Sequence, residues 1–290
     1  MTAQERSQAR MGVLYEEHVA LGGRFLSAEA GSYVAVGSYE GEREGGPARG
    51  GALLCDLTGI TYILASGTSG VALCDVALAA GVPAVGRAIE SPVLSNEAGL
   101  VSVPLAVRTG DTECVVVDAS QRGTMLTWWL NFLKGATTDT SSKSKPFLDA
   151  SLEDATSSLV PLLIVGDAAR TVLLDYVGKG QVLPGPGVVA NVRLDAITTL
   201  VTCVRTSAAR GCFLVLVPPH SARALWRSLL SFQEVEPCGI ERLQTLMAQR
   251  LAWSNVLADD EYPPVTRSQL GAWGLPCRRE GFVGAQALKP

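Results

Sequence analysis

The sequence predicts an α+β protein built from two similar lobes, because one order of strands and helices occurs twice along its 290 residues. A chain of this length fits two domains of ordinary size. Apolar residues make up 47% of the chain and charged residues 18%, which is enough apolar material for two cores and excludes a wholly disordered chain.

The first copy of the pattern starts with an apolar, β-forming run near residue 60. Ser69 is the expected N-cap of the helix that follows, and Gly81 stands where a C′ glycine belongs. The expected elements, in order, are a strand at Ile60–Ala65, a helix at Val71–Ala80, strands at Leu100–Val107 and Cys114–Val117, and a helix at Arg122–Leu133.

The second copy repeats this order, and its expected helix caps are displaced from those of the first by nearly equal intervals. A period this long indicates a domain duplication, not a solenoid. The order fits duplicated split-βαβ lobes with largely antiparallel sheets and helices on one face. The second set comprises a strand at Leu159–Val165, a helix at Ala168–Val177, strands at Thr198–Val204 and Cys212–Val217, and a helix capped by Ser221 that runs to Phe232.

The sequence also predicts the character of the connecting segments. Gly135–Ser144 is a polar linker, and Glu40–Arg49 is an exposed loop. A separate helix is expected at Ile240–Leu251, followed by an irregular tail to Pro290.

Composition excludes several classes of function. The net charge is −4 and the basic residues form no stripe, so we expect no nucleic-acid partner. The longest apolar runs, such as Leu162–Val165, are far too short to cross a bilayer, and Thr2–Gly12 lacks a signal-peptide core, so we expect no membrane partner. Seven irregularly spaced cysteines without a Cys-x-x-Cys pair predict free, buried thiols in the cytoplasm and no zinc site.

Other chemistry-bearing residues favour structural interpretations. His18 and His220 have no nucleophile nearby in the sequence, and we expect structural roles for both. Gly185–Ala190 fits a dinucleotide pattern formally but follows no strand, so a loop is expected. The acidic run Asp259–Glu261 precedes two prolines and is expected to be a solvated loop, with no metal.

Seven short segments, in order and over essentially the whole chain, resemble the glycine-cleavage T-protein (aminomethyltransferase) family. The opening helix resembles the family's LYxxHxxLGA and the last segment its DFIGREAL. The matching segments are Leu14–Gly23, Leu54–Thr58, Asn96–Val101, Val115–Ser120, Arg205–Thr206, Pro237–Ile240 and Gly281–Leu288.

This resemblance implies a T-protein-like folate-binding fold of two interlocked lobes. The implied lobes are 1–50 with 146–236, and 51–145 with 237–290. Tetrahydrofolate is the implied cofactor, and a folate or similar small molecule would lie in the cleft between the lobes. The family's C-terminal barrel lobe would begin after the last matching segment, and we expect it to be missing because the sequence ends at Pro290.

The resemblance also places four candidate substrate-binding residues. The family's catalytic aspartate falls at Ser102, which cannot carry a charge at neutral pH. Its pterin-binding glutamate falls at Gln249, and the asparagine of its VVNAS segment at Asp118. Arg205 begins the RTGYTGE segment, whose tyrosine and glutamate are both absent here. Four such departures argue against ordinary aminomethyl transfer, and no catalytic residue is assigned.

Two functional classes remain open. The first is a degenerate T-protein-like folate-binding protein, including a divergent tetrahydrofolate-dependent aminomethyl or methyl transferase. The alternative is a non-catalytic scaffold or assembly partner that binds another protein, with Ser102 and Asp118 as ordinary strand and turn residues and Gln249 as a solvated helix position. A third branch of the family serves iron–sulfur assembly, but its KGCYxGQE segment falls at Trp253–Glu261, which has neither cysteine nor glycine.

Overall fold

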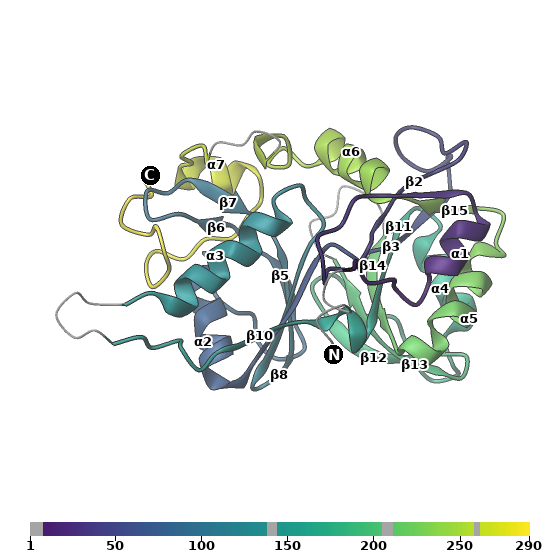
Figure 1. Cartoon of the computed structure of the whole chain (residues 1–290), viewed down its shortest axis with the longest axis horizontal. Coiled ribbons are helices and arrows are strands. Elements are labelled where there is room, and N and C mark those ends of the chain that lie inside the picture. Colours follow the sequence, from purple (N-terminus) through teal and green to yellow (C-terminus); the bar gives the residue numbers. More distant parts are fainter. Residues whose placement is uncertain (1–7, 138–143, 205–210, 258–261) are drawn as a thin grey trace. The chain divides into compact units, whose positions relative to one another are not determined.

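The chain folds into two compact units, each formed from two separate segments. The structure is a computed structural model that describes residues 8–137, 144–204, 211–257 and 262–290. Unit 1 comprises Met1–Ile60 and Ala155–Met247, and unit 2 comprises Thr61–Asp154 and Ala248–Pro290. Figure 1 shows the elements of both units.

Unit 1 is built on a six-stranded sheet of order β12-β13-β14-β11-β3-β15, in which neighbouring strands are antiparallel except for the parallel pair β15 and β3. A two-stranded sheet of β1 and β2 accompanies it. The strands are β1 (Gly23–Phe25), β2 (Val36–Tyr39), β3 (Ala52–Asp56), β11 (Val160–Gly166), β12 (Val189–Leu194), β13 (Ile197–Cys203), β14 (Cys212–Val217) and β15 (Val235–Cys238). The helices are α1 (Tyr15–Ala20), α4 (Ala169–Tyr176), α5 (Pro219–Leu230) and α6 (Ile240–Arg250), the last of which runs from unit 1 into unit 2.

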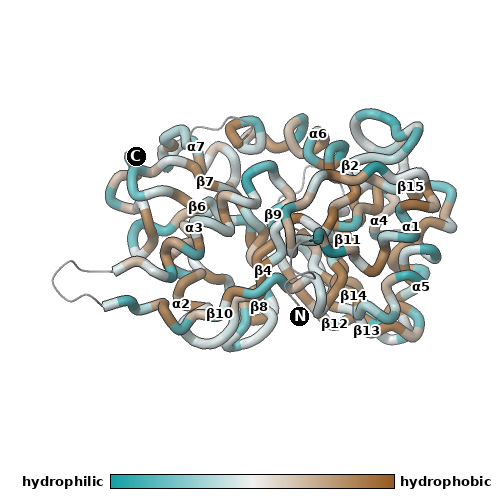
Figure 2. Tube along the Cα trace, viewed as in Figure 1, coloured by the Kyte–Doolittle hydropathy of each residue, from teal (hydrophilic) through white to brown (hydrophobic). Residues whose placement is uncertain are grey.

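The core of unit 1 lies between this sheet and its helices. β14 is buried along all six residues, and its Phe213 packs in one cluster with Val172 of α4 and Trp226 of α5. Figure 2 shows β11 and β14 largely in brown, the colour of apolar residues. A fully buried strand is expected to be apolar along its whole length, as β14 is.

Unit 2 is built on a five-stranded antiparallel sheet of order β10-β4-β9-β8-β5, with a separate β6–β7 pair. Leu73 of α2 and Leu126 and Leu130 of α3 pack with the sheet in one core. The strands are β4 (Thr61–Ser66), β5 (Ala88–Glu90), β6 (Val93–Leu94), β7 (Leu100–Ser102), β8 (Leu105–Gly110), β9 (Glu113–Asp118) and β10 (Ser151–Asp154). The helices are α2 (Gly67–Ala77), α3 (Gly123–Gly135) and α7 (Arg267–Ala272).

The two units repeat one topology. Unit 2 runs β4-α2-β5-β8-β9-α3-β10, and unit 1 runs β11-α4-β12-β13-β14-α5-β15. Corresponding strands take the same places in the two sheets, except that β3 is inserted between β11 and β15. The predicted α+β fold with duplicated split-βαβ lobes and largely antiparallel sheets is therefore confirmed.

Details of the predicted elements differ. The helices α2 and α5 begin earlier than expected, with Ser66 and Pro218 as N-caps in place of Ser69 and Ser221. The predicted strand Leu100–Val107 is divided into β7 and β8 at Val103 and Pro104, because proline has no N–H for the strand ladder. Corresponding helices consequently begin at unequal intervals, although the topology is kept.

The boundaries of the units also differ from the predicted lobes, which were 1–50 with 146–236 and 51–145 with 237–290. β3 belongs to unit 1 because it pairs with both β11 and β15. β10 belongs to unit 2 because it pairs with β4.

Two further findings concern membranes and thiols. Within the described ranges, no helix combines the length and the apolar character needed to cross a membrane. All seven cysteines are free, and six of them are buried.

Candidate functional site

Two of the four predicted site residues meet in unit 2. Ser102 is the last residue of β7 and Asp118 the last residue of β9. The Ser102 hydroxyl donates a hydrogen bond to Oδ2 of Asp118, and both residues are buried, with 0% and 3% of their surfaces exposed. The ends of two strands that are not neighbours in one sheet thus place a hydroxyl against a carboxyl group.

Local turn chemistry fixes the Asp118 side chain. Its Oδ1 accepts a hydrogen bond from the backbone N–H of Ser120 at 2.8 Å, and the Ser120 hydroxyl oxygen accepts one from the backbone N–H of Arg122 at 3.2 Å. Such turns of Asp and Ser side chains onto the following backbone are a common way to leave a strand. Both Asp118 oxygens therefore already have a donor.

The start of α3 lies very close to this turn. A Cβ added at Gly123 would lie 2.7 Å from Oγ1 of Thr61 and 3.1 Å from the carbonyl oxygen of Asp118. Only glycine lets the helix begin this close to β4 and β9, so Gly123 helps to set where the Asp118 turn ends.

A buried arginine follows the turn. Arg122 is 5% exposed, its Nε donates to the carbonyl oxygen of Leu257 at 3.1 Å, and its guanidinium carbon lies 5.2 Å from the centre of the Tyr262 ring. Sequence reasoning missed Arg122, because a single arginine after Ala-Ser-Gln looks like an exposed turn residue. The feature that could have indicated its burial is its position directly before the apolar residues of α3.

Burial changes the acidity of Asp118. Removal of the carboxyl group from water raises the pKa of Asp118, and the hydrogen bonds from Ser102 and Ser120 oppose that rise only in part. A carboxyl group of raised pKa can accept or hold a proton closer to neutral pH than an exposed aspartate can. The pair therefore offers proton-transfer and hydrogen-bonding chemistry.

The other two predicted residues do not join this pair. Gln249 is exposed on the last turn of α6 and makes no hydrogen bond to Ser102 or Asp118 within the part of the chain that the structure describes. Arg205 and the acidic run at Asp259 lie outside the described residues.

A second polar cluster is buried in unit 1. His18 of α1 lies between Asp56 and Tyr39, with 3.0 Å from Nε2 to the Asp56 Oδ2 and 2.7 Å from Nδ1 to the Tyr39 hydroxyl oxygen. Asp56 also accepts the backbone N–H of Thr58, and the ring of His18 meets Trp226 edge to face at 5.1 Å. The two ring nitrogens of His18 thus link the Asp56 carboxylate and the Tyr39 hydroxyl.

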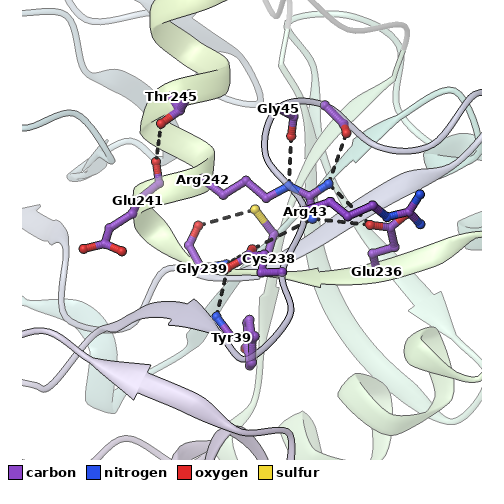
Figure 3. Close-up of polar contacts among 11 residues, drawn as sticks. Tyr39, Arg43, Gly45, Glu236, Cys238, Gly239, Glu241, Arg242 and Thr245 are labelled. Atoms are coloured by element: carbon purple, nitrogen blue, oxygen red, sulfur yellow. Dashed lines mark hydrogen bonds and ion pairs between the residues drawn. The ribbon is translucent and has the colours of Figure 1, made fainter.

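This cluster continues into an ionic network around Arg242, which Figure 3 shows. Glu42 accepts the backbone N–H groups of Tyr39 and Gly239, each at 2.9 Å. The guanidinium of Arg242 donates to the carbonyl oxygens of Gly45 and Gly46 and lies 3.3 Å from Oε2 of Glu236. The side chains of Arg242 and Glu42 are 5% and 7% exposed.

The unit 1 cluster is best explained as structural. It ties α1, the loop after β2 and the start of α6 to the sheet of unit 1, and each charged member has a partner of opposite charge or a backbone donor. This agrees with the structural role expected for His18. His220 lies exposed in the first turn of α5.

Known proteins are similar to this chain at the level of structure. No family profile matches the sequence, and no curated protein matches it. The crystal structure of glycine cleavage system aminomethyltransferase T from Bartonella henselae superposes with a TM-score of 0.62 at 20% identity, over 97% of this chain and 74% of that one. A heterotetrameric sarcosine oxidase from Corynebacterium sp. U-96 gives a TM-score of 0.45 at 16% identity, over 77% and 94% of the two chains. The chain therefore has a fold similar to that of an aminomethyltransferase, the T-protein.

Proposed function

We propose that this chain is a T-protein-like folate-binding protein in which Asp118 provides the carboxyl group of the ligand site. The observation that carries the proposal is the hydrogen bond between Ser102 and Asp118. The sequence resemblance places the family's catalytic aspartate at Ser102 and an asparagine at Asp118. Because the two side chains touch, a carboxyl group remains at this place and is supplied from β9 instead of β7.

The chemistry of a reduced folate supports this assignment. Its ring carries N–H groups, for which a carboxylate is a strong acceptor. The Ser102 hydroxyl can rotate away from Oδ2 of Asp118, and the freed oxygen can accept an N–H group or a proton from the ligand. If one-carbon transfer takes place, Asp118 is the proton acceptor and Ser102 the residue that positions it.

Thermal denaturation with tetrahydrofolate tests the proposal. Binding at a concentration 100 times the dissociation constant should stabilise the protein by about 2.7 kcal/mol. Asp118→Asn should weaken binding, whereas Asp111→Asn, in the exposed turn between β8 and β9, should not. A melting temperature that does not change in millimolar tetrahydrofolate would rule the proposal out.

The second candidate is a non-catalytic scaffold or assembly partner with the same fold. The burial of Ser102 and Asp118 favours it, because a pair whose hydrogen bonds are satisfied internally can be purely structural. On this alternative, tetrahydrofolate leaves the melting temperature unchanged, and Asp118→Asn changes stability alone. The same titration therefore separates the two candidates.

A further inference from the structure

Two buried cysteines lie opposite each other on neighbouring strands of unit 1. Cys55 of β3 and Cys238 of β15 are register partners in the parallel pairing of these strands, and each is 0% exposed. Neighbouring strands lie about 4.8 Å apart, and a disulfide requires Cα atoms about 4.4–6.8 Å apart. The backbone therefore already places this pair at a spacing that a disulfide can bridge.

The two thiols also lie on the same face of the sheet and are in contact. Leu54 packs in the core cluster with Trp226, and side chains alternate along a strand, so Cys55 points to the opposite face. Register partners share a face, and the Cys55 and Cys238 thiols are hydrogen-bonded to each other. The Cys238 thiol also donates to the carbonyl oxygen of Gly239 at 3.4 Å, as Figure 3 shows. The two sulfur atoms are thus neighbours without any change of strand register.

The other cysteines of unit 1 are too far from Cys55. Cys212 lies on β14, and β11 separates that strand from β3. Two strand spacings amount to about 9.6 Å, which exceeds the limit of about 7 Å between the Cα atoms of a disulfide. Cys203 lies on β13, one strand farther away. Cys238 is therefore the cysteine of unit 1 that can bridge to Cys55.

The position of β15 at the edge of its sheet gives an oxidant a route to the pair. β15 stands last in the strand order, next to β3. It has four residues and includes Pro237, which has no N–H for the strand ladder. Its Glu236 pairs with Arg43 at 2.9 Å and with Arg242 at 3.3 Å. A short edge strand opens locally more readily than a central strand, and opening of β15 uncovers Cys238.

A disulfide at this place would join the two separate segments of unit 1. β3 belongs to the first segment, Met1–Ile60, and β15 to the second, Ala155–Met247. The first segment of unit 2 lies between them in the sequence. A cross-link between residues so far apart removes more freedom from the unfolded chain than one that closes a short loop. Oxidation is therefore expected to stabilise unit 1.

We propose that Cys55 and Cys238 form a redox-active dithiol, which hydrogen peroxide oxidises to a disulfide between β3 and β15. Burial raises the pKa of the Cys55 thiol, so Cys55 keeps its proton, and Cys238 at the end of the edge strand reacts first. The Cys238 thiolate attacks one peroxide oxygen, which yields a sulfenic acid and releases the other oxygen as water.

The second step closes the disulfide. The Cys55 sulfur attacks the sulfenic sulfur of Cys238, so a sulfur–sulfur bond forms and the sulfur–oxygen bond breaks. A second water leaves with the proton of Cys55. Two electrons pass from the two sulfurs to one peroxide, and a dithiol reductant reverses the oxidation by thiol–disulfide exchange.

Peptide mapping of the full, folded chain tests this proposal. The chain is treated with hydrogen peroxide, its remaining thiols are blocked with iodoacetamide in denaturant, and it is digested without reduction. Mass spectrometry should then show two peptides linked through Cys55 and Cys238, and dithiothreitol should separate them. The oxidised chain should also melt at least about 4 °C higher than the reduced chain.

Cys238→Ala should abolish both the linked peptides and the rise in melting temperature. The matched control is Cys203→Ala, which removes another buried thiol of unit 1 and should keep both. Circular dichroism should show that both variants are folded. A folded chain that forms no link between Cys55 and Cys238 in excess peroxide overturns the proposal, as does a link that forms only in denaturant. A disulfide confined to Cys74 and Cys114, the hydrogen-bonded thiol pair of unit 2, would overturn it as well.

Discussion

The Asp118→Asn variant gives the sharpest test of the electrostatics of the Ser102–Asp118 pair. The pKa of Asp118 is raised by burial, so the folded protein keeps this proton at pH values where the unfolded chain has released it. Stability then falls as pH rises from the unfolded pKa, about 3.9, through the higher folded pKa. Asparagine has no proton to lose, so the stability of the variant lacks the pH dependence that Asp118 contributes to the native chain.

The difference in the free energy of unfolding between Asp118→Asn and the native chain has a pH-dependent part and a constant part. The free energy of unfolding of Asp118→Asn, minus that of the native chain, should rise with pH by up to about 1.4 kcal/mol per pH unit within the window and then level off. A pH-independent loss of about 1 kcal/mol is added, because asparagine has one side-chain oxygen, whereas Asp118 uses two to accept from Ser102 and Ser120. Relative to the native chain, the variant should therefore be least stable in acid and most stable near neutral pH.

Urea denaturation followed by tryptophan fluorescence measures this difference at several pH values between about 4 and 8. Asp111→Asn is the matched control, since Asp111 is exposed, and its difference from the native chain should stay within about 0.5 kcal/mol throughout. A difference for Asp118→Asn that is the same at every pH would refute a raised pKa and the proton-accepting role built on it.

Three further outcomes are expected. Truncation of His18 to alanine should cost about 3–5 kcal/mol in urea denaturation, because Asp56 is left buried with one fewer partner; a loss below about 1 kcal/mol would contradict the hydrogen-bonded cluster. Arg242→Ala should cost a similar amount, and Arg242→Lys should restore little of it, since an ammonium group cannot reach two carbonyl oxygens and Glu236 in the same way. Gln249→Ala, on an exposed helix position, should change stability by less than about 0.5 kcal/mol, and a larger loss would show an undetected contact.

Regular patterns in the sequence predicted most of the repeated topology. Cys212–Val217 is predicted and observed with the same bounds, and α6 ends one residue before its predicted limit. The insertion of β3 between β11 and β15 was not predictable, because strand pairing across more than a hundred residues leaves no local signal. β3 is buried on both faces, so its first four residues form a continuous apolar run, with no alternation that would identify its neighbours.

The candidate site was predictable only in its parts. The resemblance selected Ser102 and Asp118 as separate positions, and nothing in their spacing shows that β7 and β9 end beside each other. The roles of Tyr39 and Arg242 were missed for the same reason, since their partners lie far away in the sequence. Burial of a single charged residue is decided by tertiary packing and not by its immediate neighbours.

The contact between Ser102 and Asp118 links two of the four differences between this sequence and the pattern of the family that it resembles. Two carboxyl groups in hydrogen-bond contact and out of water cannot both be ionised, so one of them would be forced to keep its proton. A site of this kind accommodates one carboxylate, and an aspartate at one position favours a neutral side chain at the other. If the chain binds folate as proposed above, serine at 102 and aspartate at 118 count as one coupled difference from the family pattern, which moves the carboxyl group by the length of a hydrogen bond. Gln249 and the segment from Arg205 then remain as the independent differences from that pattern.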